Sequence, residues 1–151
     1  MRRWMLIVLC AVLAAGCTST RLPNYVQAEK PFTKRVYADY ESAVTAVKMT
    51  LDDLGWEIAE EAAPEVFEVE TDVQDTEQIL LITELRATRM FFATRYARIN
   101  VYVRSSGEIS EVELRYMVVN SMAFWKPRSY GSQSLADRFF ELLGKNLEGV
   151  R

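Results

Sequence analysis

The sequence predicts an α+β fold, an antiparallel sheet of about five strands with two amphipathic helices packed on one face. Two segments carry apolar residues at the spacing of one helix face, and the segments between them alternate apolar and polar residues with a period of two. Each predicted strand therefore has one apolar and one polar face. Such strands are typical of an antiparallel sheet that is covered on one side, and the two helices can supply that cover.

The first predicted helix follows Asp39 and ends at Gly55. Asp39 is a suitable N-cap, and glycine is the usual residue after the last turn. The second predicted helix lies near the carboxyl end of the chain and pairs Glu141 with Lys145 on its outer side. The apolar faces of the two helices are Tyr40, Val44, Val47, Leu51 and Leu54 in the first, and Leu135, Phe139, Leu142, Leu143 and Leu147 in the second.

The clearest strands are VFEVETD at 66–72, ARINVYV at 97–103, and the alternation of Val112, Leu114, Tyr116 and Val118. The turn residues Ser105, Ser106 and Gly107 join the last two strands, which predicts a β-hairpin. Two further strands are expected in WEIAEE and ILLITEL, and a short one in RVYAD before the first helix. The pattern does not specify the order of the strands in the sheet.

The amino terminus has the layout of a secretory signal peptide. Arg2 and Arg3 precede an uncharged run of twelve residues, which is too short for a bilayer-spanning helix. The run ends in LAAGC, which resembles the lipobox of bacterial lipoproteins, although Leu13 lies one place further from the cysteine than in the tightest matches. This resemblance implies cleavage between Gly16 and Cys17, a diacylglyceryl thioether on Cys17 and acylation of the new amino terminus.

Loss of residues 1–16 would remove Cys10, Arg2 and Arg3, so the net charge would move from −3 to −5. If Cys17 carries lipid, no thiol remains for a disulfide, a nucleophile or a metal site. The chain contains no histidine, which removes the commonest general base and the commonest metal ligand. We therefore expect no cofactor, no metal and no enzymatic activity, and the acidic balance argues against a nucleic-acid partner.

Three regions follow from these patterns. Residues 1–16 form the signal peptide, and residues 17–34 form the lipidated amino terminus and a flexible tether, because they contain Pro23 and Pro31 among polar residues without a period. Residues 35–151 form a single α+β domain. The length of the tether would let the domain stand away from the membrane or reach a partner.

The layout is similar to the helix-grip domains of outer-membrane lipoproteins, such as the BamC lipoprotein of the β-barrel assembly machinery. The residues that carry the similarity are LDDLGWEI at 51–58, VFEVET at 66–71, RYARINVYV at 95–103 and FFELL at 139–143. The resemblance implies a non-enzymatic accessory protein of the envelope. It assigns a functional role to no residue of this chain.

Two segments break the alternation and are candidate partner contacts. In the first, Met90, Phe91 and Phe92 lie among arginines with no acidic residue. They are either aromatics tucked under the sheet edge or an exposed tip that touches a partner or the lipid surface. In the second, Phe124 and Trp125 lie in a connection before the last helix, as core plugs at one end of the sheet or as interface anchors.

Two patterns suggest chemistry only weakly. Nine carboxylates and no basic residue lie between Glu57 and Glu77, and Glu68 with Glu70 could form an acid–base pair or a calcium site. A solvated strand face explains them better. Ser129 or Ser132 could act as a nucleophile beside Lys126, but nothing in the sequence orients such a pair.

The sequence therefore predicts a membrane-anchored lipoprotein with an accessory or scaffolding role, which binds another envelope protein. If the cell has two membranes, Thr18 after the cysteine resembles the pattern of lipoproteins sent to the outer membrane, because the aspartate retention signal is missing. This resemblance implies the outer membrane, facing the periplasm. The alternative is a binding module for a small apolar ligand or lipid, held between the helices and the sheet. An enzyme is a third and weaker reading.

Overall fold

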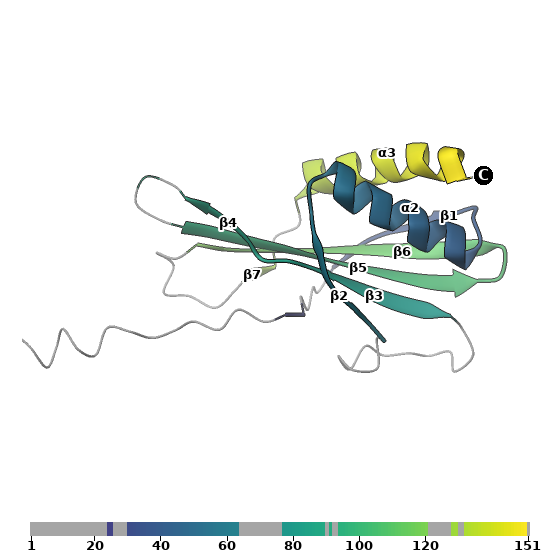
Figure 1. Cartoon of the computed structure of the whole chain (residues 1–151), viewed down its shortest axis with the longest axis horizontal. Coiled ribbons are helices and arrows are strands. Elements are labelled where there is room, and N and C mark those ends of the chain that lie inside the picture. The colour runs from purple at the N-terminus through teal and green to yellow at the C-terminus, as the bar shows by residue number, and fades with distance from the viewer. Residues whose placement is uncertain are drawn as a thin grey trace, which may run out of the picture.

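The computed structural model describes residues 24–25, 30–63, 77–89, 91, 94–120, 128–129 and 132–150. They form an antiparallel β-sheet with two helices packed together on one face (Figure 1), which confirms the predicted α+β class. The elements in chain order are β1 (Phe32–Val36), α2 (Tyr40–Asp53), β2 (Ile58–Ala62), β3 (Gln78–Thr83), β4 (Arg86–Arg89), β5 (Thr94–Ser106), β6 (Ile109–Asn120), β7 (Arg128–Ser129) and α3 (Gln133–Val150).

The long β5–β6 hairpin forms the centre of the sheet. The strand order is β1-β6-β5-β3-β2, and two short strands extend it, because β4 also pairs with β5 and β7 also pairs with β6. The hairpin register runs from Arg95 opposite Asn120 to Ser106 opposite Ile109. Gly107 closes the turn with a positive φ of 72°, a conformation that glycine adopts without the penalty of a Cβ atom.

The first helix begins and ends at the residues that the sequence predicts. The Asp39 carboxylate accepts a hydrogen bond of 2.8 Å from the Ser42 backbone N–H, which caps the helix. At the other end, the Trp56 N–H donates to the Leu51 carbonyl at 2.7 Å, and Gly55 has a φ of 69°. This is a Schellman ending, in which glycine takes the left-handed position.

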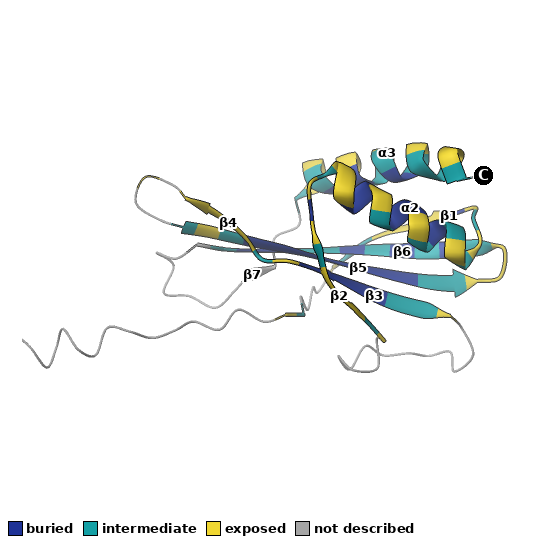
Figure 2. Cartoon of the chain, viewed as in Figure 1, coloured by how far each residue is buried: buried dark blue, intermediate teal, exposed yellow. Residues whose placement is uncertain are grey.

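The core lies between the helices and the sheet (Figure 2), where α2 and α3 bury their apolar faces against β5 and β6. The Asn146 side chain of α3 also donates hydrogen bonds to Thr50 at 3.1 Å and Asp53 at 3.0 Å on α2. The alternating residues of the two central strands point to the helices as predicted. The residues that β5 and β6 bury in this core are Ala97, Ile99, Val101, Val103, Val112, Leu114 and Val118, and the fully buried helix residues include Val47, Leu51, Phe139 and Leu143.

The structure differs from the sequence interpretation in three places. Strand β1 begins at Phe32 and Asn24–Tyr25 contact the sheet, so both lie within the range 17–34 that we expected to be a flexible tether. Strand β3 is apolar on both faces, because Leu81 points to the helices while Leu80 and Ile82 form a small cluster on the opposite face. Strands β4 and β7 were not predicted. The strand expected at 66–72 lies outside the described residues.

Candidate functional site

The β4–β5 hairpin extends beyond the part of the sheet that the helices cover (Figure 1). Strands β3 and β4 follow each other along the same side of β5, so they form one bent strand. Ile82 pairs with Asn100 and Arg86 pairs with Ala97, which leaves three residues on one side of the bend opposite two on the other. This is a β-bulge, and bulges bend the strand that carries the extra residue and increase its twist.

Thr83 compensates for the ladder bonds that the bulge interrupts. Its hydroxyl accepts a hydrogen bond from the Ile99 N–H and donates one to the Ile99 carbonyl, both at 3.0 Å. Thr83 is fully buried, so these backbone groups have no access to water at this point. The buried backbone groups of Ile99 are therefore hydrogen-bonded at the bulge, so the bulge leaves neither of them unsatisfied.

Arg86 fastens the base of the hairpin to the end of α2. Its guanidinium lies 4.0 Å from the centre of the Trp56 ring and donates a hydrogen bond to the Gly55 carbonyl. Trp56 in turn packs edge-on against Tyr116 with ring centres 6.4 Å apart, and the Arg95 guanidinium donates to the Tyr116 hydroxyl at 3.4 Å. Residues of the α2–β2 connection, β4, β5 and β6 thus fix the direction of the hairpin.

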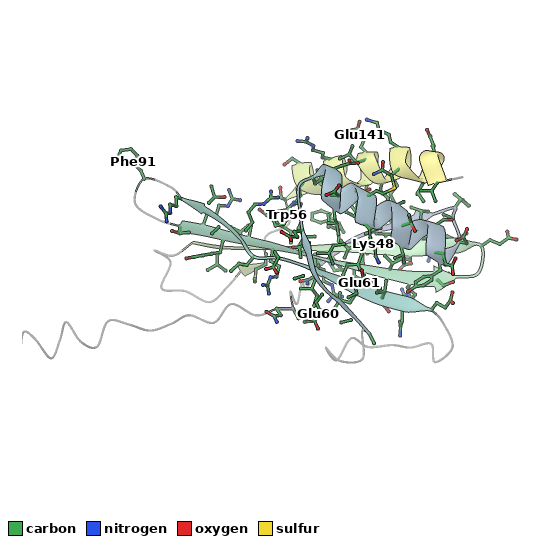
Figure 3. The ribbon with its side chains drawn as sticks, in the orientation of Figure 1. Lys48, Trp56, Glu60, Glu61, Phe91 and Glu141 are labelled. Carbon is green, nitrogen blue, oxygen red and sulfur yellow. The ribbon has the colours of Figure 1, made fainter. Side chains whose placement is uncertain are left out.

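Phe91 lies at the tip of this hairpin, far from the helices (Figure 3), and its side chain is 97% exposed. For Phe91, this exposure favours the interpretation as an exposed tip over the interpretation as an aromatic tucked under the sheet edge. The other predicted contact residues Met90, Phe92, Phe124 and Trp125 lie outside the described residues, as do Gly16 and Cys17.

The hairpin is basic although the whole chain carries a net charge of −3. All residues of β4 are exposed, including Arg86 and Arg89, and Arg95 is exposed on β5. The hairpin sequence from 86 to 97 contains three arginines and no aspartate, glutamate or lysine. The site therefore combines an exposed aromatic residue with positive charge, and its chemistry suits a contact surface better than a catalytic centre.

A second site, which the sequence interpretation missed, lies on the sheet face opposite the helices. The side-chain oxygen of Asn24 accepts a hydrogen bond of 2.8 Å from Arg98, and its carbonyl accepts one of 3.3 Å from the Asn100 amide. The Tyr25 ring packs against the cluster of Leu80, Ile82 and Tyr102. The Arg115 guanidinium donates to the Tyr25 hydroxyl and lies 5.2 Å from the centre of its ring.

The polar residues of this face are buried. Asn100 is fully buried and Arg98 is 8% exposed, whereas alternation alone predicted that both would face solvent. Burial lowers the pKa of the Arg98 guanidinium, and the Glu84 carboxylate opposes this shift. The continuous apolar run ILLI at 79–82 was the available signal, because a strand without alternation is typically buried on both faces.

The remaining candidates for chemistry find structural roles or lie outside the described residues. The Ser132 hydroxyl accepts a weak hydrogen bond of 3.4 Å from the Leu135 N–H at the start of α3, which is a capping contact. Lys126, Glu68 and Glu70 are outside the described ranges, and the side chain of Ser129 is likewise not described. Of the acidic stretch, Glu60 and Glu61 are exposed, and Glu61 pairs with Lys48 at 2.6 Å.

Two further observations concern the described part of the chain. It contains no group of three or more histidine, cysteine, aspartate or glutamate residues that could hold a metal ion. Its helices are too short or too polar for any of them to cross a membrane.

No protein-family model matches the sequence, and no curated protein matches it. Among solved structures, the chain is similar to the vertebrate conserved region of human METTL16, with a TM-score of 0.42 and 9% sequence identity. The match covers 80% of this chain and 97% of that one. A likeness at this level supports no statement about function, so the functional argument depends on the residues themselves.

Proposed function

We propose that the protein is a lipid-anchored lipoprotein of the bacterial cell envelope with a non-enzymatic accessory or scaffolding role. It binds another envelope protein through the tip of the β4–β5 hairpin. The observation that carries this proposal is Phe91, a large aromatic side chain that is 97% exposed at the end of a hairpin fastened at its base. Exposed aromatic residues on a rigid support are typical anchors of protein–protein contacts.

The charge of the hairpin indicates the character of the partner surface. Arg89 and Arg95 lie on the two strands next to the tip, and no acidic residue lies near them in the sequence. A complementary surface would offer an apolar pocket with carboxylates around it. Charge complementarity of this kind mainly accelerates association and selects the partner, while the aromatic anchor supplies most of the affinity.

The membrane anchor in this proposal depends on the sequence LAAGC, whose Cys17 would carry the lipid. Outer-membrane localisation facing the periplasm depends on Thr18 in the same way. The alternative function, a module that holds a small apolar ligand between helices and sheet, receives less support. Phe139, Leu51 and Leu143 are fully buried and occupy the space between these layers.

Phe91→Glu tests the contact. We expect this variant to lose its partner while its free energy of unfolding changes by less than about 1 kcal/mol, because surface substitutions rarely change stability by more. Tyr37→Glu is the matched control, since Tyr37 is also an exposed aromatic residue, at 77%, but lies outside the hairpin. Thermal melts of the purified variants check the stability.

Partner binding is measured in intact cells with a photo-crosslinking amino acid at position 91 or at position 37. A protein adduct at position 91, absent at position 37 and competed by unlabelled wild type but not by Phe91→Glu, is the expected result. Adducts that contain only lipid would show that the tip contacts the bilayer instead of a protein. If Phe91→Glu unfolds the domain, Phe91 is part of the core and the proposal is overturned.

A further inference from the structure

The contacts of Asn24 and Tyr25 join the amino-terminal segment to the middle of the sheet. They involve neighbouring positions on β5 and β6, because Arg98 and Asn100 lie on β5 and Arg115 is paired with Asn100. Tyr25 packs on the small cluster of Leu80, Ile82 and Tyr102, which lies on the sheet face opposite to the one that α2 and α3 cover. We name Asn24, Tyr25, Arg98, Asn100 and Arg115 the N-terminal clasp.

The chemistry of the clasp is specific to the residues that form it. Asn24 offers two oxygen acceptors to two donors from β5. Tyr25 offers a ring to an apolar cluster and a hydroxyl to Arg115, so it uses both its apolar and its polar parts. Arg98 and Asn100, the β5 residues of the clasp, are buried. Loss of the contacts with Asn24 would therefore leave their polar groups with fewer hydrogen-bond partners in a buried site, which costs free energy.

The position of the clasp in the chain limits the distance between the domain and an anchor on Cys17. Seven residue steps separate Cys17 from Asn24, and an extended chain of that length spans at most about 25 Å. If the clasp were open, the free chain would run to β1 at Phe32, fifteen steps from Cys17, and could span about 50 Å. Closing the clasp thus halves the reach of the domain.

We propose that the helix-free face of the sheet is the docking surface for the chain's own Asn24–Tyr25, and that this docking holds the domain close to the bilayer. The helix-free face is turned to the membrane, and the helices face away from it. The partner of the hairpin must then present its binding surface near the membrane. The consequence for membrane distance rests on the proposed function, because it requires the lipid on Cys17, whereas the clasp itself does not.

A double-mutant cycle in the full chain tests the clasp without reference to the membrane. Tyr25→Ala and Arg115→Ala should each lower the melting temperature, and the double variant should lose less than the sum of the two single shifts, because the Tyr25 ring also packs on the apolar cluster and Arg115 also pairs with Glu113. Tyr37→Ala combined with Arg115→Ala is the control. Its two shifts should add, because Tyr37 follows the β1 residue that pairs with Ser110, and Arg115 lies five residues further along β6. Additive shifts for Tyr25 and Arg115 would overturn the clasp.

The distance from the membrane is measured on the lipidated full chain in vesicles. A donor dye on Glu141→Cys, an exposed position of α3, transfers energy to an acceptor in the bilayer. Tyr25→Ala should reduce the transfer, by an increase in distance of up to about 25 Å, while Tyr37→Ala should leave it unchanged. Equal transfer for wild type and Tyr25→Ala would overturn the proposed control of distance.

The two measurements separate the two proposals. A wild-type protein that does not remain with the vesicles in a flotation assay contradicts the lipid anchor, and therefore the proposed function. In that case the double-mutant cycle still decides whether the clasp forms. A third outcome is that the melting shifts are non-additive and the protein remains with the vesicles, but the energy transfer is the same for wild type and Tyr25→Ala. This outcome would support the clasp and contradict its role in setting the distance from the membrane.

Discussion

Asp39 determines where α2 begins. Its carboxylate accepts hydrogen bonds from both the backbone N–H and the hydroxyl of Ser42, at 2.8 and 2.9 Å. The backbone bond is the main cause that holds the pKa of Asp39 below its ordinary value of 3.8, and the Ser42 hydroxyl adds to the shift. A lowered pKa means that folding favours the ionised form, so the cap stabilises the domain more when Asp39 is charged than when it is protonated.

We therefore expect Asp39→Ala to lower the melting temperature at neutral pH, and Asp39→Asn to preserve most of it, because asparagine is also a good cap. The sign of the pH dependence follows from the lowered pKa. The advantage of wild type over Asp39→Ala should be full above pH 3.8, and its charge-dependent part should be lost as the pH falls through the folded-state pKa. Melts at a series of pH values check this, and an advantage that grows on acidification would contradict it.

At the scale of single residues, the sequence predicted what depends on local chemistry. Asp39 and Gly55 were identified because a cap and a helix-ending glycine act within their own segment. Asn24 and Tyr25 were not identified, because their partners Arg98 and Arg115 are more than seventy residues away. Nothing in a polar, proline-containing segment shows that one asparagine and one tyrosine meet a distant strand.

At the scale of elements, the β-bulge between β3 and β4 decides the direction of the hairpin. Thr83→Val should remove the hydroxyl that serves both backbone groups of Ile99 and leave them unpaired in a buried site. We expect a loss of about 1–3 kcal/mol in the free energy of unfolding, the usual cost of an unsatisfied buried group. Denaturant titration measures it.

Thr83→Ser is the matched control, because it keeps the hydroxyl and removes only a methyl group, which costs about 0.8 kcal/mol. A smaller loss for Thr83→Val than for Thr83→Ser would show that the hydroxyl is not needed at the bulge. Hydrogen exchange adds a local readout, since the Ile99 N–H should lose protection in Thr83→Val and keep it in Thr83→Ser.

The elements could be predicted where periodicity is strong and not where it is weak. The alternation at 97–103 and 112–118 predicted β5 and β6, and the two apolar stripes predicted both helices. Strand β4 escaped prediction because RATR is exposed at every position and has no alternation to detect. Phe91 stood out because an aromatic residue interrupts a polar, basic segment, but only the structure shows that Phe91 is exposed.

At the scale of the whole molecule, the two faces of the sheet have different tasks. The helix-covered face contains the main core, which includes Phe139 and Leu51. The opposite face contains the smaller cluster and the clasp. The anchor, the clasp and the hairpin tip follow one another outward from the membrane in our proposal, so the position of each limits the next.

The Cys17→Ser variant tests the lipid anchor without changing the folded domain. Serine has no thiol to form the diacylglyceryl thioether, so we expect the variant to be uncleaved or released from the membrane fraction. The core residues Val47, Leu51 and Phe139 lie far from Cys17 in the sequence and are packed against one another, so the melting temperature of the domain should not change. Flotation of membranes and mass spectrometry of the mature amino terminus provide the measurements.

Membrane retention of a Cys17→Ser chain that has lost residues 1–16, or an unmodified amino terminus at Cys17 or Thr18 in the wild type, would contradict the lipid anchor. The comparison with Phe91→Glu then separates the two halves of the function. Phe91→Glu should remain on the membrane and lose its partner, whereas Cys17→Ser should keep an intact tip but lose the position from which the tip can reach the partner. If Cys17→Ser retains full partner binding in cells, the domain does not need to be held near the membrane for binding. The limit that the clasp sets on the distance from the membrane would then be irrelevant to partner binding.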